Sequence, residues 1–268
     1  MELGLFGRRV VVTGGTKGIG RAIASELLAE GAAVAFCARK GDEVKQVEAA
    51  LSEERRVAAG EATAEVYGFT ADMTSPVEVE RFVLEAASAL GGIDVLVNNA
   101  GGAHPGNFES LTDEDWEKDL DVKLFSQIRC TRAALPYLRR SPAARVVNIN
   151  AVYAKYPDPN FFATTVIRAA CLNLTKVLAQ EFGPEGILVN SVNIGFVATP
   201  QWENIRRRRA PDTSEEEFFS VLATAEVPLG RFGTVGEVSG LVAFLASDRA
   251  SYITGSMIDV AGGMGKYV

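Results

Sequence analysis

The sequence predicts an α/β protein built on a single doubly wound parallel sheet, with helices covering both of its faces. Short runs rich in β-branched residues alternate with longer helical stretches along the chain, which is typical of repeated strand–helix–strand units. The strand-like runs are apolar almost throughout, as strands covered on both sides must be. A turn with several glycines follows the first of these strands and precedes a helix, which is where parallel sheets bind nucleotides.

The individual elements follow from apolar runs, period and turn residues. Strands are expected in chain order at 8–14, 32–38, 65–72, 93–101, 144–151, 186–195 and 256–263. Helices are expected between them at 20–31, 43–56, 76–91, 113–138, 164–183 and 235–247. One stretch, 199–229, departs from the alternation because it is long, highly charged and helix-prone.

The bulk composition limits the class of protein. The net charge is −7 and the pI is about 5.0, so a general basic surface for nucleic acid is not expected. The three cysteines have no paired spacing, which favours a reducing, cytoplasmic location over a disulfide framework or a zinc cluster. No signal segment and no apolar run near about eighteen residues is present, so no membrane partner is expected.

The glycine-rich turn has the features of a phosphate-binding loop. Gly14, Gly18 and Gly20 lie between an apolar strand and an amphipathic helix. Glycine allows the backbone to approach a phosphate closely, and the following helix offers free N–H groups to an anion. A glycine-rich turn without a ligand is the alternative, and the strand–turn–helix context argues against it.

The end of the second strand indicates which dinucleotide is bound. An acidic residue there would hold a ribose 2′-hydroxyl, but the chain has Arg39, with Lys17 in the glycine loop. Two cations at this end favour a 2′-phosphate, and therefore NADP(H) over NAD(H). Two solvated surface cations are the alternative, and the acidic Asp42 and Glu43 lie just beyond.

Several motifs together resemble the short-chain dehydrogenase/reductase family. TGGTKGIG at 13–20 matches the cofactor loop of the family, and ADMT at 71–74 contains its adenine-contacting acid, here Asp72. NNAG at 98–101 and GSMIDVAGG at 255–263 match the segments at the fourth and seventh strands. The resemblance covers essentially the whole chain. It implies one Rossmann-type domain over 1–268, a nicotinamide cofactor, and a homotetramer or a homodimer.

The same resemblance implies the residues that contact the cofactor. They are Gly14, Thr16, Lys17, Gly18, Ile19, Gly20, Arg39, Asp72, Met73, Asn99, Ala100, Gly101, Arg168, Gly195, Val197 and Thr199. Thr199 corresponds to the residue that binds the nicotinamide carboxamide in the family.

The resemblance fails at the four side chains on which the family's proton transfer relies. The Asn position carries Lys123, and the Ser position carries Ala151. The Tyr and Lys positions carry Thr164 and Arg168. The proline-glycine pair after the sixth strand is also replaced, by Ile194-Gly195. The hydride route is therefore retained, while the usual proton route is lost.

The replacements have different chemical capacities. Arg168 can hold ribose hydroxyls but cannot act as an acid or a base near neutral pH. Thr164 has an alcohol whose pKa is too high to replace a phenol. Lys123 could reach into the vacated space, where the charge of Arg168 would lower its pKa and suit it to donate a proton. The alternative is that Lys123 snorkels toward solvent or pairs with Asp119 or Asp121.

Other side chains near the expected site are further candidates. Asn150 could hold a substrate oxygen, or make a structural loop contact. Tyr153 and Tyr156 could each fill the gap with a phenol, or simply pack. His104 is the only histidine, and its intrinsic pKa suits proton transfer, although a lone loop histidine is often incidental.

The charged segment 199–229 corresponds to the substrate lid of the family, and Trp202, Phe218 and Phe219 could form an apolar wall over the substrate. The sequence thus favours an NADP(H)-dependent oxidoreductase acting on a carbonyl or alcohol of a small molecule, with a non-standard proton donor. The alternatives are an NADP-binding enzyme of elimination or isomerisation, and an inactive NADP-binding member of the family. The substrate and the reaction direction stay open.

Overall fold

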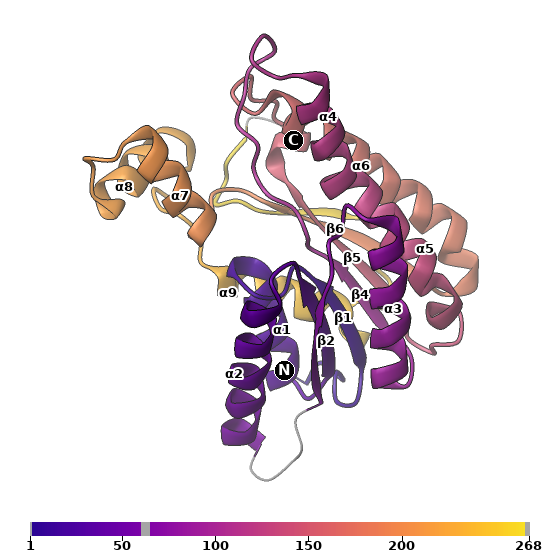
Figure 1. Ribbon diagram of the computed structural model, residues 1–268. Helices are drawn as coiled ribbons and strands as arrows, with labels where there is room; N and C mark the ends of the chain where they lie inside the picture. The colour runs from indigo at the N-terminus through magenta and orange to yellow at the C-terminus, as the bar shows by residue number, and fades with distance from the viewer. Residues whose placement is uncertain (1, 60–64, 266–268) are drawn as a thin grey trace.

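The computed structural model describes residues 2–59 and 65–265. Its centre is a seven-stranded parallel sheet with the strand order β3-β2-β1-β4-β5-β6-β7 (Figure 1). The strands are β1 Arg9–Thr13, β2 Ala33–Ala38, β3 Val66–Thr70, β4 Val95–Asn98, β5 Arg145–Ala151, β6 Leu188–Ile194 and β7 Met257–Val260. Each lies within a predicted run, and the strand order changes direction between β1 and β4, as in a doubly wound sheet. The predicted fold class is confirmed.

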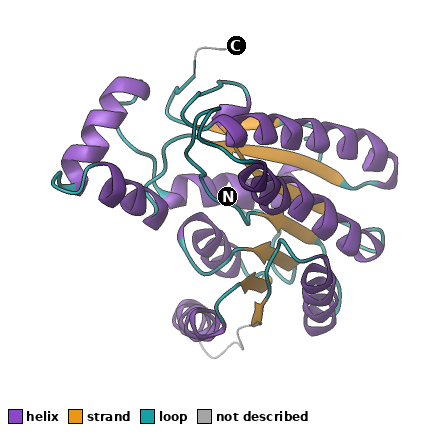
Figure 2. Ribbon diagram, turned by 45° about the horizontal axis from the view of Figure 1, so that its top comes forward, coloured by secondary structure: helices purple, strands orange, loops and turns teal. Residues whose placement is uncertain are grey.

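Helices form a layer on each side of the strands (Figure 2). They are α1 Gly18–Ala29, α2 Gly41–Ala59, α3 Pro76–Leu90, α4 Asp113–Leu120, α5 Ser126–Leu138, α6 Phe162–Phe182, α7 Pro200–Arg209, α8 Glu215–Glu226 and α9 Val235–Ala246. Figure 1 shows α1, α2 and α9 on one face, and α3, α5 and α6 on the other.

The alternation of side chains along β1 divides the apolar core into two parts. Val10 and Val12 belong to one cluster, with Ile23 of α1. Val11 points to the opposite face and belongs to the second cluster, with Phe82 of α3. All five side chains are almost completely buried, and burying each contributes roughly 1.5–3 kcal/mol. The sheet is therefore fixed from both sides.

The loops after β1 and β4 meet where the strand order changes direction. The side-chain amide of Asn99 donates hydrogen bonds to the carbonyls of Thr13 at 2.9 Å and Gly14 at 3.1 Å. The backbone amides of Asn99 and Ala100 both donate to the Thr13 hydroxyl at 2.9 Å. These bonds hold the glycine loop against the end of β4. Doubly wound sheets bind ligands at this edge.

The helix predicted over 113–138 is not continuous. After α4, the residues Asp121–Phe125 form one turn of π-helix, in which the Ser126 amide donates to the Asp121 carbonyl. The Ser126 hydroxyl also donates to the Val122 carbonyl at 2.7 Å. Single π-turns within helices are frequent at functional sites, and Lys123 lies at the centre of this one. The composition on both sides is helical, so the sequence pattern did not show the interruption.

Residues 199–229 contain α7 and α8, which project from the rest of the molecule (Figure 1). An aromatic cluster links them to the sheet. Trp202 of α7 packs edge-on against Phe196, with ring centroids 4.7 Å apart. Phe219 of α8 stacks on Phe232, with centroids 4.4 Å apart. The predicted helical character of this segment is therefore seen in the structure.

Helix α6 corrects one expectation from the sequence. The segment Phe162–Glu185 is long and apolar enough, by length and composition, to cross a membrane, although no run of this length was expected. Within the described residues it is the one such segment. Ala179 and Phe182 belong to the core between the helices and the sheet, and α6 packs on β5 and β6. A core helix has the same apolar character.

A partly buried ion pair between Arg9 and Asp94 lies where β1 and β4 begin, at the edge of the sheet opposite to the glycine loop. Asp94 accepts hydrogen bonds from the guanidinium of Arg9 at 2.6 and 2.9 Å, from its amide at 2.9 Å, and from the Ser141 hydroxyl at 2.6 Å. Burial by itself raises the pKa of Asp94, but these hydrogen bonds and the Arg9 charge outweigh it and hold that pKa at about 2.

We therefore expect Asp94→Asn to lower the free energy of unfolding by about 2 kcal/mol at pH 7. Because the folded-state pKa is depressed, the contribution is complete above the unfolded pKa near 4 and is lost as the pH falls toward about 2. Urea unfolding of both proteins at several pH values measures it. A difference that stays constant from pH 7 to below pH 4 would contradict this assignment.

Candidate active site

A cavity of about 1050 Å³ opens at the carboxyl edge of the sheet. Every residue that the sequence assigned to the cofactor lines this cavity, from Gly14 of the glycine loop to Thr199 before α7. The catalytic candidates that line it are His104, Asn150, Tyr153, Thr164 and Arg168. Lys123 differs from them because it is completely buried behind the cavity wall.

The glycine loop can accept a phosphate at close range. Gly14 has a φ of 72°, and Gly18, where α1 begins, has a φ of 51°. A Cβ atom on Gly20 would lie 2.2 Å from the Gly14 carbonyl oxygen, so no larger residue fits there. The first turn of α1 receives no side-chain cap, which leaves its N–H groups directed at the cavity mouth for an anion.

The far end of the cavity has three cations and one carboxylate. Glu43 accepts hydrogen bonds from Lys17 at 2.9 Å and from Lys40 at 3.1 Å, and these contacts lower the pKa of Glu43. Arg39 is exposed and, within residues 2–59 and 65–265, forms no ion pair. Lys40 is therefore a third cation beside Arg39 and Lys17, which the sequence indicated. Glu43 contacts the two lysines and leaves Arg39 outside these bonds.

Asp72 and Met73 lie along the next part of the wall. Asp72 Oδ1 accepts hydrogen bonds from the amide and the hydroxyl of Thr74, both at 2.9 Å. Met73 is buried, and its sulfur contacts those of Cys37 and Cys130 at 3.9 and 3.8 Å. The Asp72 carboxyl is thus oriented at the end of β3, with one oxygen outside this turn.

The other end of the cavity contains a buried charged cluster. Lys123 Nζ donates to Asp119 Oδ1 and, at 3.1 Å, to Thr164 Oγ1. The Thr164 hydroxyl in turn donates to Asp119 Oδ2 at 3.2 Å. Asp119 and Thr164 line the cavity, whereas Lys123 has no exposed surface. Pairing with Asp119 is thus the alternative that the structure shows for Lys123, while Asp121 pairs with Arg129 at 2.9 Å.

Burial is the main cause of an altered protonation equilibrium at this lysine. Burial, and then the Arg168 guanidinium, lower the pKa of Lys123 to about 8, against the opposing effect of the Asp119 carboxylate. A lysine with such a pKa is a proton donor near neutral pH. Its ammonium lies behind Thr164 and Asp119, the two residues in contact with it that line the cavity.

Arg168 and Asn150 form a second hydrogen-bonded group in the same wall. Arg168 Nη1 donates to the Ile149 carbonyl at 2.8 Å and to Asn150 Oδ1 at 3.2 Å. The Asn150 amide donates to the Ser191 hydroxyl at 2.9 Å. Within the part of the chain that the structure describes, Arg168 Nε has no hydrogen-bond partner, although the residue is only 8% exposed. Asn150 thus orients Arg168, which is the structural contact named as its alternative.

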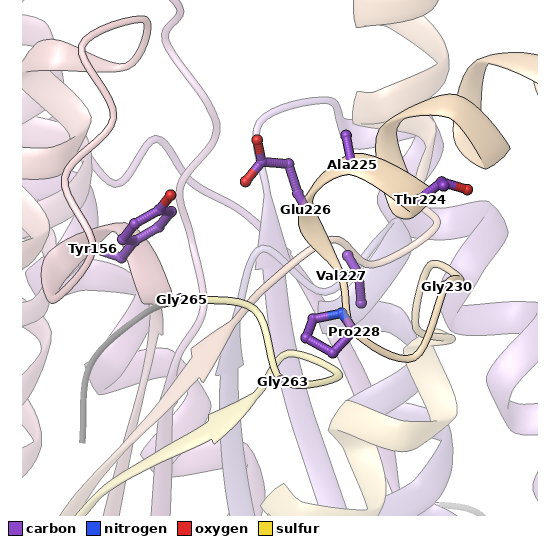
Figure 3. A pocket seen from close by; sticks show the side chains of 9 residues that line it. All are labelled: Tyr156, Thr224, Ala225, Glu226, Val227, Pro228, Gly230, Gly263 and Gly265. Atoms are coloured by element: carbon purple, nitrogen blue, oxygen red, sulfur yellow. The ribbon is translucent and has the colours of Figure 1, made fainter.

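Neither Tyr153 nor Tyr156 forms a hydrogen bond to the Lys123–Asp119–Thr164 cluster within the described residues. Tyr153 stacks on Phe161 with ring centroids 5.1 Å apart. Burial, and then the Asp158 carboxylate, raise the pKa of Tyr153, so its phenol is a weak proton donor. Tyr156 lines a separate, smaller cavity with Glu226 and Pro228 (Figure 3).

His104 lies at the cavity wall beside the cluster. Its Nδ1 is 3.6 Å from Asp119 Oδ1, and its Nε2 is 3.6 Å from Asp115 Oδ1. The imidazole is about one-third exposed, while the Asp119 side chain is nearly buried. Both carboxylates belong to α4, which a Thr112–Asp115 capping box begins.

Asp119 is the residue whose importance the sequence did not show. It was considered only as a partner that would occupy Lys123, yet it contacts Lys123 and Thr164 and lines the cavity. An acidic residue four positions before a lysine on one helix is the signal that could have identified it. Such pairs are common on exposed helices, so the spacing alone does not indicate a buried site.

Comparisons with known proteins agree with this geometry. A family model described as enoyl-(acyl carrier protein) reductase matches residues 14–265. The 3-oxoacyl-(acyl-carrier-protein) reductase of Aquifex aeolicus is 33% identical over 264 residues, which are 98% of this chain and 100% of that protein.

Two solved structures extend the comparison to three dimensions. An NADPH-bound short-chain oxidoreductase from Pseudomonas aeruginosa PAO1, described as containing an atypical catalytic center, is 37% identical. Its TM-score is 0.89 over 98% of this chain and 99% of that one. L-sorbose reductase from Gluconobacter frateurii, solved with NADPH and L-sorbose, is 29% identical with a TM-score of 0.94 over 100% of both chains. The chain therefore belongs to the short-chain dehydrogenase/reductase family of oxidoreductases.

Proposed function

We propose that this protein is an NADP(H)-dependent oxidoreductase that interconverts a carbonyl and an alcohol on a small molecule, with Lys123 as its proton source. The observation that carries the proposal is the contact of Lys123 Nζ with Thr164 Oγ1, at 3.1 Å. This contact lies in the wall of a cavity that has a full nucleotide cradle. The NADPH bound to two solved relatives supports the choice of cofactor.

The residues present fit the phosphorylated dinucleotide at each end. The uncapped start of α1 would hold the pyrophosphate. Arg39, with Lys17 and Lys40, would hold the 2′-phosphate, which competes with Glu43 for the two lysines. Arg168 would hold the nicotinamide ribose, since its Nη2 lies close to Gly101 and its Nε has no partner among the described residues.

The chain's own residues manage the charge and the proton of the reaction. When bound, the reduced cofactor supplies a hydride to the carbonyl carbon. The Thr164 hydroxyl rotates from Asp119 to the substrate oxygen and donates its proton there. It takes a proton from the Lys123 ammonium in the same event, so no free threonine alkoxide forms. Arg168 is a fixed cation in the same wall and stabilises negative charge on the substrate oxygen.

The segment 199–229 supports the proposed role of a substrate lid. Trp202 of α7 lines the cavity. Phe219 of α8 stacks on Phe232 in the aromatic cluster, and the ring centroids of Phe218 and Phe219 are 6.0 Å apart. An apolar wall with a few polar groups is typical of small-molecule sites. A carbonyl compound with an apolar arm therefore fits this cavity better than a fully polar one.

The protein is further proposed to act in the cytoplasm as a homotetramer or a homodimer. Large apolar side chains that are about half exposed support an oligomer. They are Phe125 of the π-turn and Val166 and Val177 of α6. The reduced state of Cys37, Cys130 and Cys171, all buried, agrees with that location.

Replacing the lysine tests the proposed proton source. Lys123→Met keeps most of the volume and removes the proton, so we expect kcat for carbonyl reduction to fall by roughly 10²–10⁴-fold. The Kd for NADPH should not change, because Lys123 lies outside the cavity. Stopped-flow absorbance of NADPH oxidation measures the rate, and fluorescence titration measures the binding.

The control for this variant is Asp119→Asn/Lys123→Met. The single variant leaves a buried carboxylate unpaired, at a cost of about 3–5 kcal/mol, whereas the double variant is neutral and should fold. We expect it to bind NADPH and to remain inactive; full activity would refute the proton route. In the unaltered protein, product formation without cofactor consumption would instead favour elimination or isomerisation. NADPH binding by the unaltered protein with no turnover on any carbonyl would favour an inactive binding protein.

The protonation of Lys123 predicts opposite pH profiles for the two directions. Reduction needs the ammonium, so kcat should be level below about pH 8 and fall above it. Alcohol oxidation needs the neutral amine and should rise over the same range. Lys123→Arg, whose guanidinium does not release a proton near neutral pH, should be slow at every pH and should lose this fall in kcat above pH 8. A limb that stays near pH 8 in this variant would assign it to another group.

A further inference from the structure

The buried proton source has no direct access to water. Lys123 has no exposed surface, and Asp119 and Thr164 are only 3% and 5% exposed. Each reduction would remove one proton from Lys123, so the proton must be replaced before the next turnover. Asp119 and Thr164 line the cavity, so when cofactor and substrate fill it, a group that both touches this cluster and reaches solvent is required.

His104 is the group in that position. Its Nδ1 lies 3.6 Å from Asp119 Oδ1, which is the same oxygen that contacts Lys123 Nζ. A third of the imidazole is exposed, so its other side can exchange protons with water. The 3.6 Å distance is slightly longer than a hydrogen bond, and catalytic hydrogen bonds are often this long before substrate binds.

We propose that His104 and Asp119 form the path by which protons pass between solvent and Lys123. This inference rests on the proposed function, and it adds two positioning residues to that site. In the reduction direction His104 takes a proton from water. Its Nδ1–H then passes to Asp119 Oδ1, and from that oxygen the proton moves to the neutral Lys123 amine. Each turnover thus consumes one hydride and one solvent proton to make one alcohol.

The charged groups around the path support this direction of transfer. Asp115 and Asp119 of α4 face His104, each with a carboxyl oxygen 3.6 Å from an imidazole nitrogen. Arg168 and Cys171 of α6 face Lys123, and the Arg168 cation favours release of the lysine proton toward Thr164. Carboxylates thus surround the exposed end of the path, and a second cation lies at its buried end.

Asp115 offers a matched control for Asp119. It lies at the same 3.6 Å from the imidazole, but it contacts Nε2 and has no contact with Lys123 or Thr164 among the described residues. An asparagine at 115 can still accept the hydrogen bonds of Thr112 that begin α4. Asp115→Asn therefore changes the surroundings of His104 without interrupting the path.

The experiment compares His104→Ala, His104→Gln and Asp115→Asn with the wild type on one carbonyl compound that the wild type reduces. We expect both His104 variants to lose about tenfold or more in steady-state kcat, with KM and the Kd for NADPH unchanged. Their first hydride transfer should stay near the wild-type rate in a single turnover, because Lys123 begins protonated. Asp115→Asn should turn over almost as the wild type does.

Added imidazole provides the second readout. Because His104 is at the cavity wall, free imidazole should restore turnover of His104→Ala and should not restore Lys123→Met. Wild-type turnover by the His104 variants, or no rescue by imidazole, would overturn the path while leaving the proton source intact. If Lys123→Met and the wild type are equally active, the proposed function fails and the path fails with it.

Discussion

The buried ion pair between Lys123 and Asp119 is the interaction on which the rest of the site depends. An unpaired ammonium would be very costly in the interior, so Asp119 must accompany the lysine. Arg168 adds a second cation to the same wall, and the two cations share one close carboxylate. Burial, together with the Arg168 charge, lowers the pKa of Lys123. The excess positive charge also suits this wall to stabilise an oxygen that becomes negative.

Of the four side chains expected at the family's proton-transfer positions, Lys123 and Thr164 are in direct contact, and the Arg168 charge acts on Lys123. Thr164 accepts a hydrogen bond from Lys123, and its small side chain leaves space for an ammonium behind it. Arg168 is held by Asn150, which is itself held by Ser191 of β6. Ala151 lines the cavity without a polar atom. The nucleotide cradle is built mostly from other loops.

Much of this structure could be predicted from the sequence, and the failures have physical causes. The strands and the cavity lining follow from apolar runs and glycine spacing, because parallel strands deliver their loops to one edge. The position of Lys123 does not follow, since a π-turn at Asp121–Phe125 changes the phase of the helix and the composition does not show it. Nor does composition reveal that Asn150 is fully buried, or that Tyr156 lines a different cavity.

The most direct test of this account is the titration of Lys123 itself. Proteins with isotope-labelled lysine side chains, with the Lys123→Met variant to assign the signal, can be followed by NMR across the pH range with NADP⁺ bound. The account predicts that the Lys123 side chain titrates near pH 8. Titration at the ordinary value for a lysine, about 10.4, would show a permanently charged structural ion pair and would contradict the proposed proton source.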